Sequence, residues 1–371
     1  MRVLLAPDKF KGTLSSRQVA DLLAGHLTRL KPGWECVRCP MADGGDGTLE
    51  TLQTSASVRV DFAVTDALGR AGRAFCLQGR DDAGEFLAFE SASCLSLSAI
   101  EPAKRDPLIA TSHGLGGLLR QALLRLPHTR LVVALGGTAT VDGGLGFLQA
   151  LGADIQLESG GRRAPLRAGD MEKVFKADLT PLHGLFKGRN VEGWCDVVSP
   201  LLGPEGAARM FAPQKGAGPQ AVERLEKGMS HWAARLEEAS GRPLRAQPGA
   251  GAAGGLGMAV LALGGRLANG FEAVSKTVGL EGKIRDCDAV VTGEGRLDAS
   301  TRLGKAPWGV LLAASRAKKP CWAVVGSAEP GAEGWEGVVA LVTEGRGVPE
   351  DPSSDAIWEK AARELIGLIE G

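Results

Sequence analysis

Apolar segments that end in glycine-rich loops with acids or hydroxyls recur along this sequence. Asp8 comes two positions after the end of the run at residues 2–6, and Glu294 comes three positions after the end of the run at residues 289–291. Segments with apolar residues at helical spacing lie between such runs, which predicts strand–helix–strand units and hence a parallel sheet. Because ligands bind beyond the carboxyl ends of parallel strands, these loops are where a site is expected.

Both ends of the chain show this pattern, whereas the middle is mixed. Ser15 and Gln18 have the spacing of a capping box that opens a helix. Residues 57–97 instead contain short alternating runs that are typical of antiparallel strands. The prediction is an α/β fold with two domains. Residues 1–57 and 268–371 form a doubly wound, mostly parallel Rossmann-like domain, residues 58–267 form an inserted mixed α/β domain, and a cleft separates the two.

Composition narrows the class of protein. Glycine accounts for 53 of 371 residues, about twice the usual share. With 44% hydrophobic residues the chain is not a disordered one, so the glycines indicate tight loops. The 43 Lys and Arg balance the 43 Asp and Glu, which argues against a nucleic acid or a membrane surface as partner. The start of the chain lacks the apolar run of an export signal, and no apolar stretch is long enough to cross a bilayer, so a cytoplasmic protein is expected.

The residue types in the loops suit phosphoryl transfer. Carboxylates with few histidines suit Mg²⁺, and glycine loops at helix starts suit phosphate oxygens. Phosphoryl transfer needs positioning and charge neutralisation more than covalent help. The alternative is that these are ordinary turn and N-cap residues. The candidates are Asp8, Lys11, Asp43, Asp46, Thr138, Thr140, Asp142, Glu294, Arg296 and Asp298.

One run, from Gly249 to Gly254, matches the GxGxxG pattern of dinucleotide-binding proteins. Residues 242–248 before it are polar and contain proline, so the strand that this pattern requires is missing. Close packing of a helix on its neighbour is therefore the favoured interpretation. Among the five histidines, only His113 is kept as a site candidate, because it lies in a Thr-Ser-His-Gly stretch before a predicted helix.

Seven blocks, in order along the chain, resemble the class I glycerate kinases. They include Ala-Pro-Asp-Lys-Phe-Lys-Gly-Thr-Leu-Ser at residues 6–15 and Thr-Gly-Glu-Gly-Arg-Leu-Asp at residues 292–298. The others lie at residues 42–48, 135–144, 195–197, 211–217 and 248–257. The resemblance implies phosphorylation of D-glycerate by ATP with Mg²⁺, in a protein of two α/β domains around a cleft. The product is 2-phosphoglycerate or 3-phosphoglycerate, with the 2-position favoured for this class.

Roles for the candidates follow from this resemblance. Asp43 or Asp196 would take the proton of the glycerate hydroxyl, since an acid in a closed site can have a raised pKa. Glu294 and Asp298 are the Mg²⁺ candidates. The cations expected to hold the carboxylate or the transferring phosphoryl group are Lys11, Lys215, Arg296 and Lys305, of which Lys11 is assigned to catalysis. The other substrate or phosphate candidates are Asp8, Asp46, Thr138, Asp142, Gly251 and Gly254.

Three positions depart from the family pattern. Gly117, Val141 and Ser199 stand where the family often has Glu, Asn and Asn, and each removes a polar group near the expected site. These departures bear on substrate detail more than on reaction class. Two other functions stay open: an NAD(P)-dependent hydroxy-acid oxidoreductase that uses the glycine run, and a non-catalytic sensor of sugar acids. A homodimer is left open as well.

Overall fold

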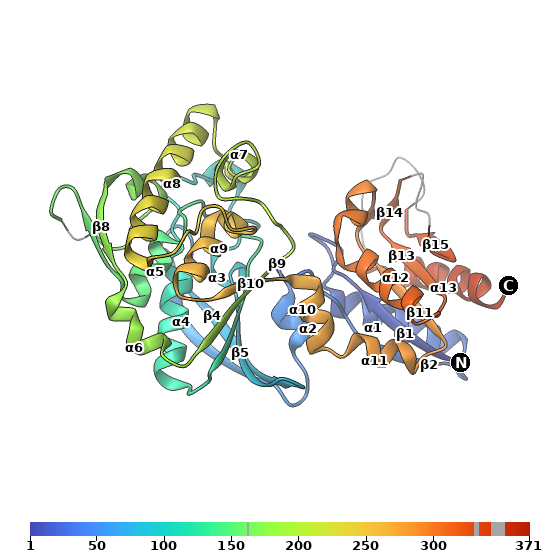
Figure 1. The fold of residues 1–371 in the computed structure, drawn as a ribbon. Coiled ribbons are helices and arrows are strands. Elements are labelled where there is room, and N and C mark those ends of the chain that lie inside the picture. The colour runs from blue at the N-terminus through green and yellow to red at the C-terminus, as the bar shows by residue number, and fades with distance from the viewer. Residues whose placement is uncertain (162, 330–333, 343–352) are drawn as a thin grey trace. The chain divides into compact units, whose positions relative to one another are not determined.

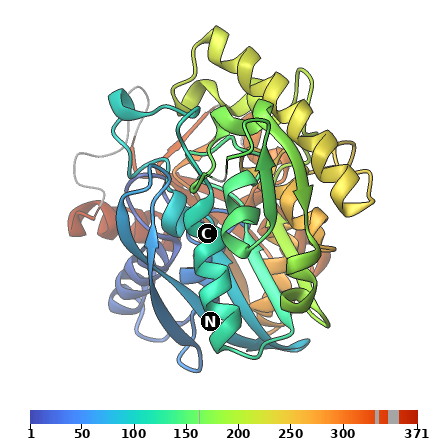
Figure 2. The same cartoon turned by 90° about the vertical axis from the view of Figure 1, so that its left-hand side faces the viewer.

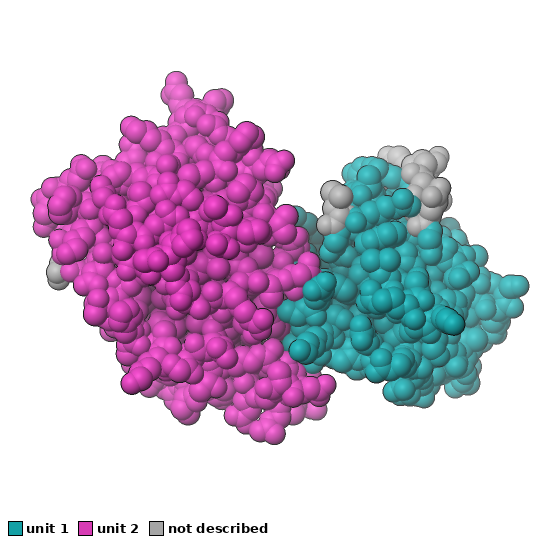
Figure 3. Space-filling view, viewed as in Figure 1, with its two compact units in different colours: residues 1–43, 50–52, 270–371 teal, residues 44–49, 53–269 magenta. Residues whose placement is uncertain are grey.

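The computed structural model describes residues 1–161, 163–329, 334–342 and 353–371. Its chain divides into two units, coloured separately in Figure 3. Unit 1 contains residues 1–43, 50–52 and 270–371, and unit 2 contains residues 44–49 and 53–269. The domain boundaries expected after residues 57 and 267 stay a prediction.

The sheet of unit 1 is parallel throughout (Figure 1). In spatial order its strands are β15 (Gly337–Ala340), β13 (Cys321–Val325), β11 (Ala289–Gly293), β1 (Arg2–Pro7) and β2 (Glu35–Arg38). A strand that is buried on both faces needs apolar residues at consecutive positions. This is why residues 3–6 and 289–291 are apolar without alternation, and all of them are buried.

Helices cover both faces of this sheet. On one face α1 (Ser16–Leu30) and α13 (Asp355–Glu370) pack on each other and on alternate strand residues. On the other face α12 (Ala306–Arg316) packs on β1, β11 and β13. The remaining helices in and around this unit are α2 (Thr48–Leu52), α10 (Gly270–Thr277) and α11 (Leu280–Arg285), and a short parallel pair is formed by β12 (Arg296–Leu297) and β14 (Ser327–Ala328).

The capping box predicted for α1 is confirmed. Ser15 Oγ accepts a hydrogen bond from the main-chain nitrogen of Gln18 at 3.3 Å, and Gln18 Oε1 accepts one from the main-chain nitrogen of Ser15 at 2.8 Å. Two otherwise unsatisfied donors of the first helical turn thereby gain partners.

The main sheet of unit 2 is mixed. In spatial order its strands are β10 (Arg266–Asn269), β9 (Asn190–Cys195), β6 (Arg130–Ala134), β5 (Gly84–Glu90), β4 (Ala71–Asp81) and β3 (Val58–Thr65). The first four strands run parallel to one another. Strand β4 is antiparallel to both of its neighbours, β5 and β3. The alternating residues within 57–97 had predicted antiparallel strands here. A second, antiparallel pair consists of β7 (Asp154–Leu157) and β8 (Val174–Asp178).

One face of this mixed sheet forms the core of unit 2 together with helices (Figure 2). The longer helices are α4 (His113–Arg125), α5 (Leu145–Leu151), α8 (Pro219–Ser240) and α9 (Ala252–Ala262), and the short ones are α3 (Ala92–Leu95), α6 (His183–Phe186) and α7 (Ala207–Phe211). Helices α4 and α5 lie side by side. Val141, one of the departures from the family pattern, is buried in this core, where an apolar side chain fits.

The expected α/β fold with mostly parallel strands is confirmed. Among the described residues, every helix is too short or too polar to span a membrane.

Candidate active site

Unit 1 has a topological switch point between β1 and β11. From β1 the chain continues to β2 on one side of the sheet, while the later strands β11, β13 and β15 add on the other side. Pro7 is paired with Gly293 in register, so Asp8 and Glu294 come next on two neighbouring strands. The main-chain nitrogen of Asp8 donates to the Gly293 carbonyl oxygen at 2.8 Å. Crevices of this kind are where open parallel sheets bind ligands.

Asp8 is buried, with 7% of its surface exposed. Burial raises its pKa to about 7; the positive charge of Lys9 opposes this shift, and the negative charges of Asp43 and Glu294 add to it. Its Oδ1 accepts a hydrogen bond from the main-chain nitrogen of Lys9 at 2.7 Å. Lys9 Nζ lies 3.7 Å from Asp43 Oδ1, so the predicted base Asp43 is held beside a cation.

Glu294 is connected to the loop that follows it. Its Oε1 accepts a hydrogen bond from Thr301 Oγ1 at 2.6 Å, and its Oε2 accepts one from Lys305 Nζ at 3.4 Å. Lys305 Nζ also lies 3.7 Å from Asp298 Oδ1. Burial raises the pKa of Glu294, and its hydrogen bond with Thr301 lowers it less strongly. Two carboxylates therefore hold one lysine at the carboxyl edge of β11.

Asp298 caps the short helix at residues 299–303 through Ser300, whose main-chain nitrogen donates to Asp298 Oδ1 at 2.9 Å. The side chain of Ser300 also donates to this oxygen, and these hydrogen bonds hold the pKa of Asp298 below its usual range. Arg296 is exposed and forms ion pairs with Glu329 and Asp298. Lys11 is exposed on the loop after β1.

In unit 2 the loop after β6 contains Asp142, which is fully buried. Its Oδ2 accepts hydrogen bonds from the nitrogen and Oγ of Ser112, each at 2.8 Å, and from the nitrogen of Gly146 at 3.2 Å. Its Oδ1 accepts one from the nitrogen of Gly144 at 3.2 Å. Burial raises the pKa of Asp142, and these hydrogen bonds oppose that shift. Asp142 thus holds the loop to the start of α4 and of α5, while a role in binding substrate stays a prediction.

Lys215 reaches the same loop from the short helix at residues 213–215. Its Nζ donates to the Thr140 carbonyl oxygen at 2.8 Å and to Thr138 Oγ1 at 3.4 Å. Lys215 is buried, and burial lowers its pKa to about 7, although the negative charge of Asp142 favours the protonated form. The structure brings Lys215 together with the loop that carries Thr138, Thr140 and Asp142, while a role of these residues in binding substrate stays a prediction.

The GxGxxG run packs on this loop. Residues 241–251, all described, contain no strand, and α9 begins with three consecutive left-handed residues, Ala253 to Gly255. A Cβ on Gly254 would lie 2.0 Å from the Thr140 carbonyl oxygen, and one on Gly251 would lie 2.3 Å from the Pro200 carbonyl oxygen. These glycines allow close approach of backbone to backbone. Phosphate binding by Gly251 and Gly254 stays a prediction.

The remaining predicted residues of unit 2 lie on neighbouring loops. Asp46 is exposed, and a Cβ on Gly137 would lie 3.2 Å from the Asp46 Cβ atom, so its loop contacts the one after β6. Asp196 is exposed directly after β9. His113 begins α4 half-buried, and burial lowers its pKa, which favours the neutral imidazole.

Three polar residues that support the site were missed at the sequence level. Ser112 holds Asp142, and Thr301 holds Glu294. Glu90, buried at the end of β5, accepts a hydrogen bond from the main-chain nitrogen of Leu49 at 3.0 Å. Glu90 follows the apolar run 86–89, so the rule that singled out Asp8 and Glu294 could have found it.

The acidic residues fit a cation that arrives with phosphate. Among the described residues no group of three or more His, Cys, Asp or Glu side chains is placed to hold a metal ion. Mg²⁺ is commonly held by one or two carboxylates together with water and substrate phosphates. Glu294 and Asp298, which both approach Lys305, are hard oxygen donors of this kind.

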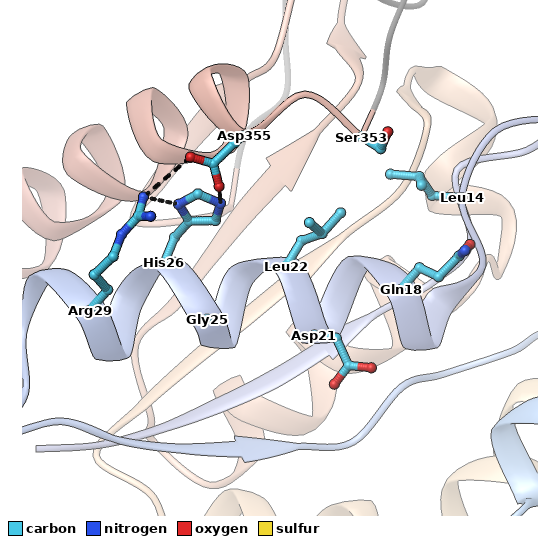
Figure 4. Close-up of a pocket in the computed structure, with 9 residues that line it drawn as sticks. All are labelled: Leu14, Gln18, Asp21, Leu22, Gly25, His26, Arg29, Ser353 and Asp355. Atoms are coloured by element: carbon cyan, nitrogen blue, oxygen red, sulfur yellow. Dashed lines mark hydrogen bonds and ion pairs between the residues drawn. The ribbon is translucent and has the colours of Figure 1, made fainter.

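A cavity of about 520 Å³ lies elsewhere in unit 1, along α1 and the start of α13 (Figure 4). Within it His26 Nε2 lies 3.2 Å from Asp355 Oδ1, and His26 Nδ1 lies 3.0 Å from Arg29 Nη2. No residue predicted for the active site lines this cavity. His26, which was not a candidate for the site, is buried on α1.

Comparison with known proteins points to one family. Residues 3–368 match the glycerate kinase family. The chain is 37% identical to glycerate 2-kinase of Escherichia coli (strain K12), over 88% of this chain and 85% of that protein. Glycerate kinase of Bacillus subtilis (strain 168) is also 37% identical, with the same coverage of 88% and 85%. A solved structure assigned as glycerate kinase 2 from Salmonella typhimurium LT2 has a TM-score of 0.85 at 33% identity, covering 100% of this chain and 99% of that one.

Proposed function

Because this chain belongs to the glycerate kinase family, whose members are enzymes, we propose that it transfers the γ-phosphoryl group of ATP to D-glycerate. We propose the 2-hydroxyl as the acceptor and 2-phosphoglycerate as the product. The name of the Escherichia coli relative, glycerate 2-kinase, supports this choice of position.

The observation that carries the proposal is the pair Asp8 and Glu294 at the switch point of the parallel sheet. The two follow residues paired in register, and the charge of Glu294 adds to the raised pKa of Asp8. Carboxylates at the ends of neighbouring strands repel each other unless a proton or a cation lies between or beside them. A site that receives metal-bound phosphate and takes a proton from a hydroxyl requires such groups.

Mg²⁺ would supply charge neutralisation at the transferring phosphoryl group. Glu294 and Asp298 are the side chains that we propose to hold it. Lys305 pairs with both carboxylates, and it is the cation that we propose to contact an anion at the same edge of the sheet. Arg296 is engaged by Glu329 and Asp298, so a role in binding phosphate would require it to exchange these partners.

The proton of the attacking hydroxyl needs an acceptor near neutral pH. Asp43 and Asp196 are the predicted acceptors, and Asp8 joins them because its pKa of about 7 leaves part of the population ionised and basic at that pH. Asp43 and Asp8 share Lys9 as a neighbour, which would stabilise either carboxylate. Lys11, exposed after β1, remains the catalytic cation of the proposal.

Release of ADP from Mg²⁺·ATP tests the proposal, with and without D-glycerate and with EDTA as a control. The proposal predicts ADP that requires both glycerate and the metal. Glycerate binding without ADP would instead establish the sensor. Glycerate oxidation with NAD(P) would establish the oxidoreductase, which the missing strand before Gly249 disfavours. Action in the cytoplasm and assembly into a homodimer stay predictions, the latter open to size-exclusion chromatography.

A further inference from the structure

Lys215 is a buried cation that forms no ion pair with any residue that the structure describes. Only 4% of its surface is exposed, and in the described part of the chain no carboxylate forms an ion pair with it. Its ammonium has three donors, of which one goes to the Thr140 carbonyl oxygen and one, at 3.4 Å, to Thr138 Oγ1. Burial of an unpaired charge is costly, and proteins rarely retain one without a use.

Thr140, whose carbonyl oxygen Lys215 contacts, carries a side-chain oxygen that has no partner among the described residues. Thr140 is fully buried, and its Oγ1 finds no hydrogen-bond partner among the described residues. Lys215 donates to the main chain of Thr140 and to the side chain of Thr138, so the unpartnered hydroxyl belongs to a residue that Lys215 contacts. Buried hydroxyl groups are normally hydrogen-bonded, so a ligand or a water molecule is expected to bind to this one.

The charges around Lys215 indicate which ligand fits. Asp142, on the same loop, accepts its hydrogen bonds from Ser112, Gly144 and Gly146. It therefore affects Lys215 only through its negative charge, which raises the pKa of the ammonium. Arg105 packs beside Gly216 and donates to the Gln214 carbonyl oxygen. One ammonium with two hydroxyls matches a small anion of single charge, such as a carboxylate. A phosphate of two or more charges would need further cations or a metal ion.

We propose that Lys215, Thr138 and Thr140 receive the carboxylate of the acid substrate. This inference rests on the proposed function, since it takes D-glycerate as the acid. An opposite charge favours the protonated ammonium, and Lys215 starts only partly protonated at neutral pH because its pKa is about 7. Binding of glycerate then takes up a proton from solution.

Calorimetric titration of the whole chain with D-glycerate at pH 7.5, in buffers of different ionisation enthalpy, measures this uptake. We expect roughly 0.8 proton per glycerate, the share of Lys215 that is neutral at that pH when its pKa is about 7. Thr140→Val removes the hydroxyl without adding bulk. It should weaken glycerate binding about ten-fold or more, as loss of a hydrogen bond to a charged group does, with binding of a non-hydrolysable ATP analogue unchanged.

Lys215→Met should abolish the linked proton uptake, whereas Lys227→Met, at an exposed lysine of the same unit, should leave it unchanged. Two results would overturn the inference and leave the proposed function standing. One is glycerate turnover by the wild type without proton uptake. The other is a Thr140→Val variant that binds glycerate as tightly as the wild type. Absence of both glycerate binding and glycerate-dependent ADP overturns the two together.

Discussion

Asp142 accepts two hydrogen bonds from Ser112, one from its main-chain nitrogen and one from its Oγ, each at 2.8 Å. Ser112 Oγ in turn accepts a hydrogen bond from the main-chain nitrogen of Phe147 at 2.8 Å. The hydrogen bonds of these two residues therefore connect the loop after β6 to the first turns of α4 and α5. Because Lys215 contacts the same loop, the stability of this pair affects the geometry of the proposed carboxylate site.

Ser112→Ala should lower the free energy of unfolding by about 2 kcal/mol. The substitution leaves the buried Asp142 with one donor fewer and the Phe147 nitrogen without its acceptor, and each such loss costs on the order of 1 kcal/mol or more. Urea unfolding measures the change. Ser98→Ala, at an exposed serine, is the control and should differ from the wild type by less than about 0.5 kcal/mol. Equal stability of the two variants would show that the hydrogen bonds between Ser112 and Asp142 do not stabilise the fold.

Lys215 should make stability depend on pH. Its pKa falls from 10.5 to about 7 on folding, so the unfolded chain holds more protons between these values and stability rises with pH across that window. The difference in unfolding free energy, wild type minus Lys215→Met, should therefore rise between pH 7.5 and 9.5. The slope is at most about 1.4 kcal/mol per pH unit. Taking the difference cancels the cysteines, which titrate in the same range. A difference that is flat or falls with pH would contradict the burial of Lys215.

Lys318→Gly should stabilise the chain by about 1 kcal/mol. Lys318 follows α12 in the left-handed region, with φ of 55°, and its main-chain nitrogen donates to the Ser315 carbonyl oxygen as in a Schellman motif. A side chain costs about 1 kcal/mol in this conformation, which glycine adopts freely. Thermal or urea unfolding checks the gain. Gly241→Ala, at the corresponding position after α8, should destabilise by a similar amount, and a stabilising effect there would count against the argument.

The parallel strands and the acids at their ends could be predicted from the sequence, because consecutive apolar residues and the residue that follows them are local features. Asp8 and Glu294 were found in this way. The partners of Asp142 and Lys215 could not, since Ser112 is 30 residues from Asp142 and Thr140 is 75 residues from Lys215. An acid in a glycine-rich loop can hold either a ligand or its own backbone, and only the tertiary positions of the N–H groups decide between them. The left-handed Ala253 gave no signal either, because alanine favours an ordinary helix.

Asp43→Asn and Asp8→Asn should each lower kcat by about 100-fold or more while leaving the far-ultraviolet circular dichroism unchanged. An amide has nearly the shape of the carboxylate but cannot accept the proton or carry the charge. Steady-state kinetics with varied glycerate and ATP separate kcat from KM. Asp21→Asn, at an exposed acid on α1, is the matched control and should keep full activity. If Asp196→Asn alone abolishes turnover, the proton acceptor belongs to unit 2 and the assignment to Asp8 or Asp43 is wrong.

The measurement that tests the central claim most directly couples the reaction to enolase without phosphoglycerate mutase. Purified chain with Mg²⁺·ATP and D-glycerate should give phosphoenolpyruvate absorbance that rises in step with ADP release, because only 2-phosphoglycerate is an enolase substrate. ADP release with absorbance that appears only after mutase is added would contradict the 2-position. A folded chain that releases no glycerate-dependent ADP at all would contradict the proposed kinase itself.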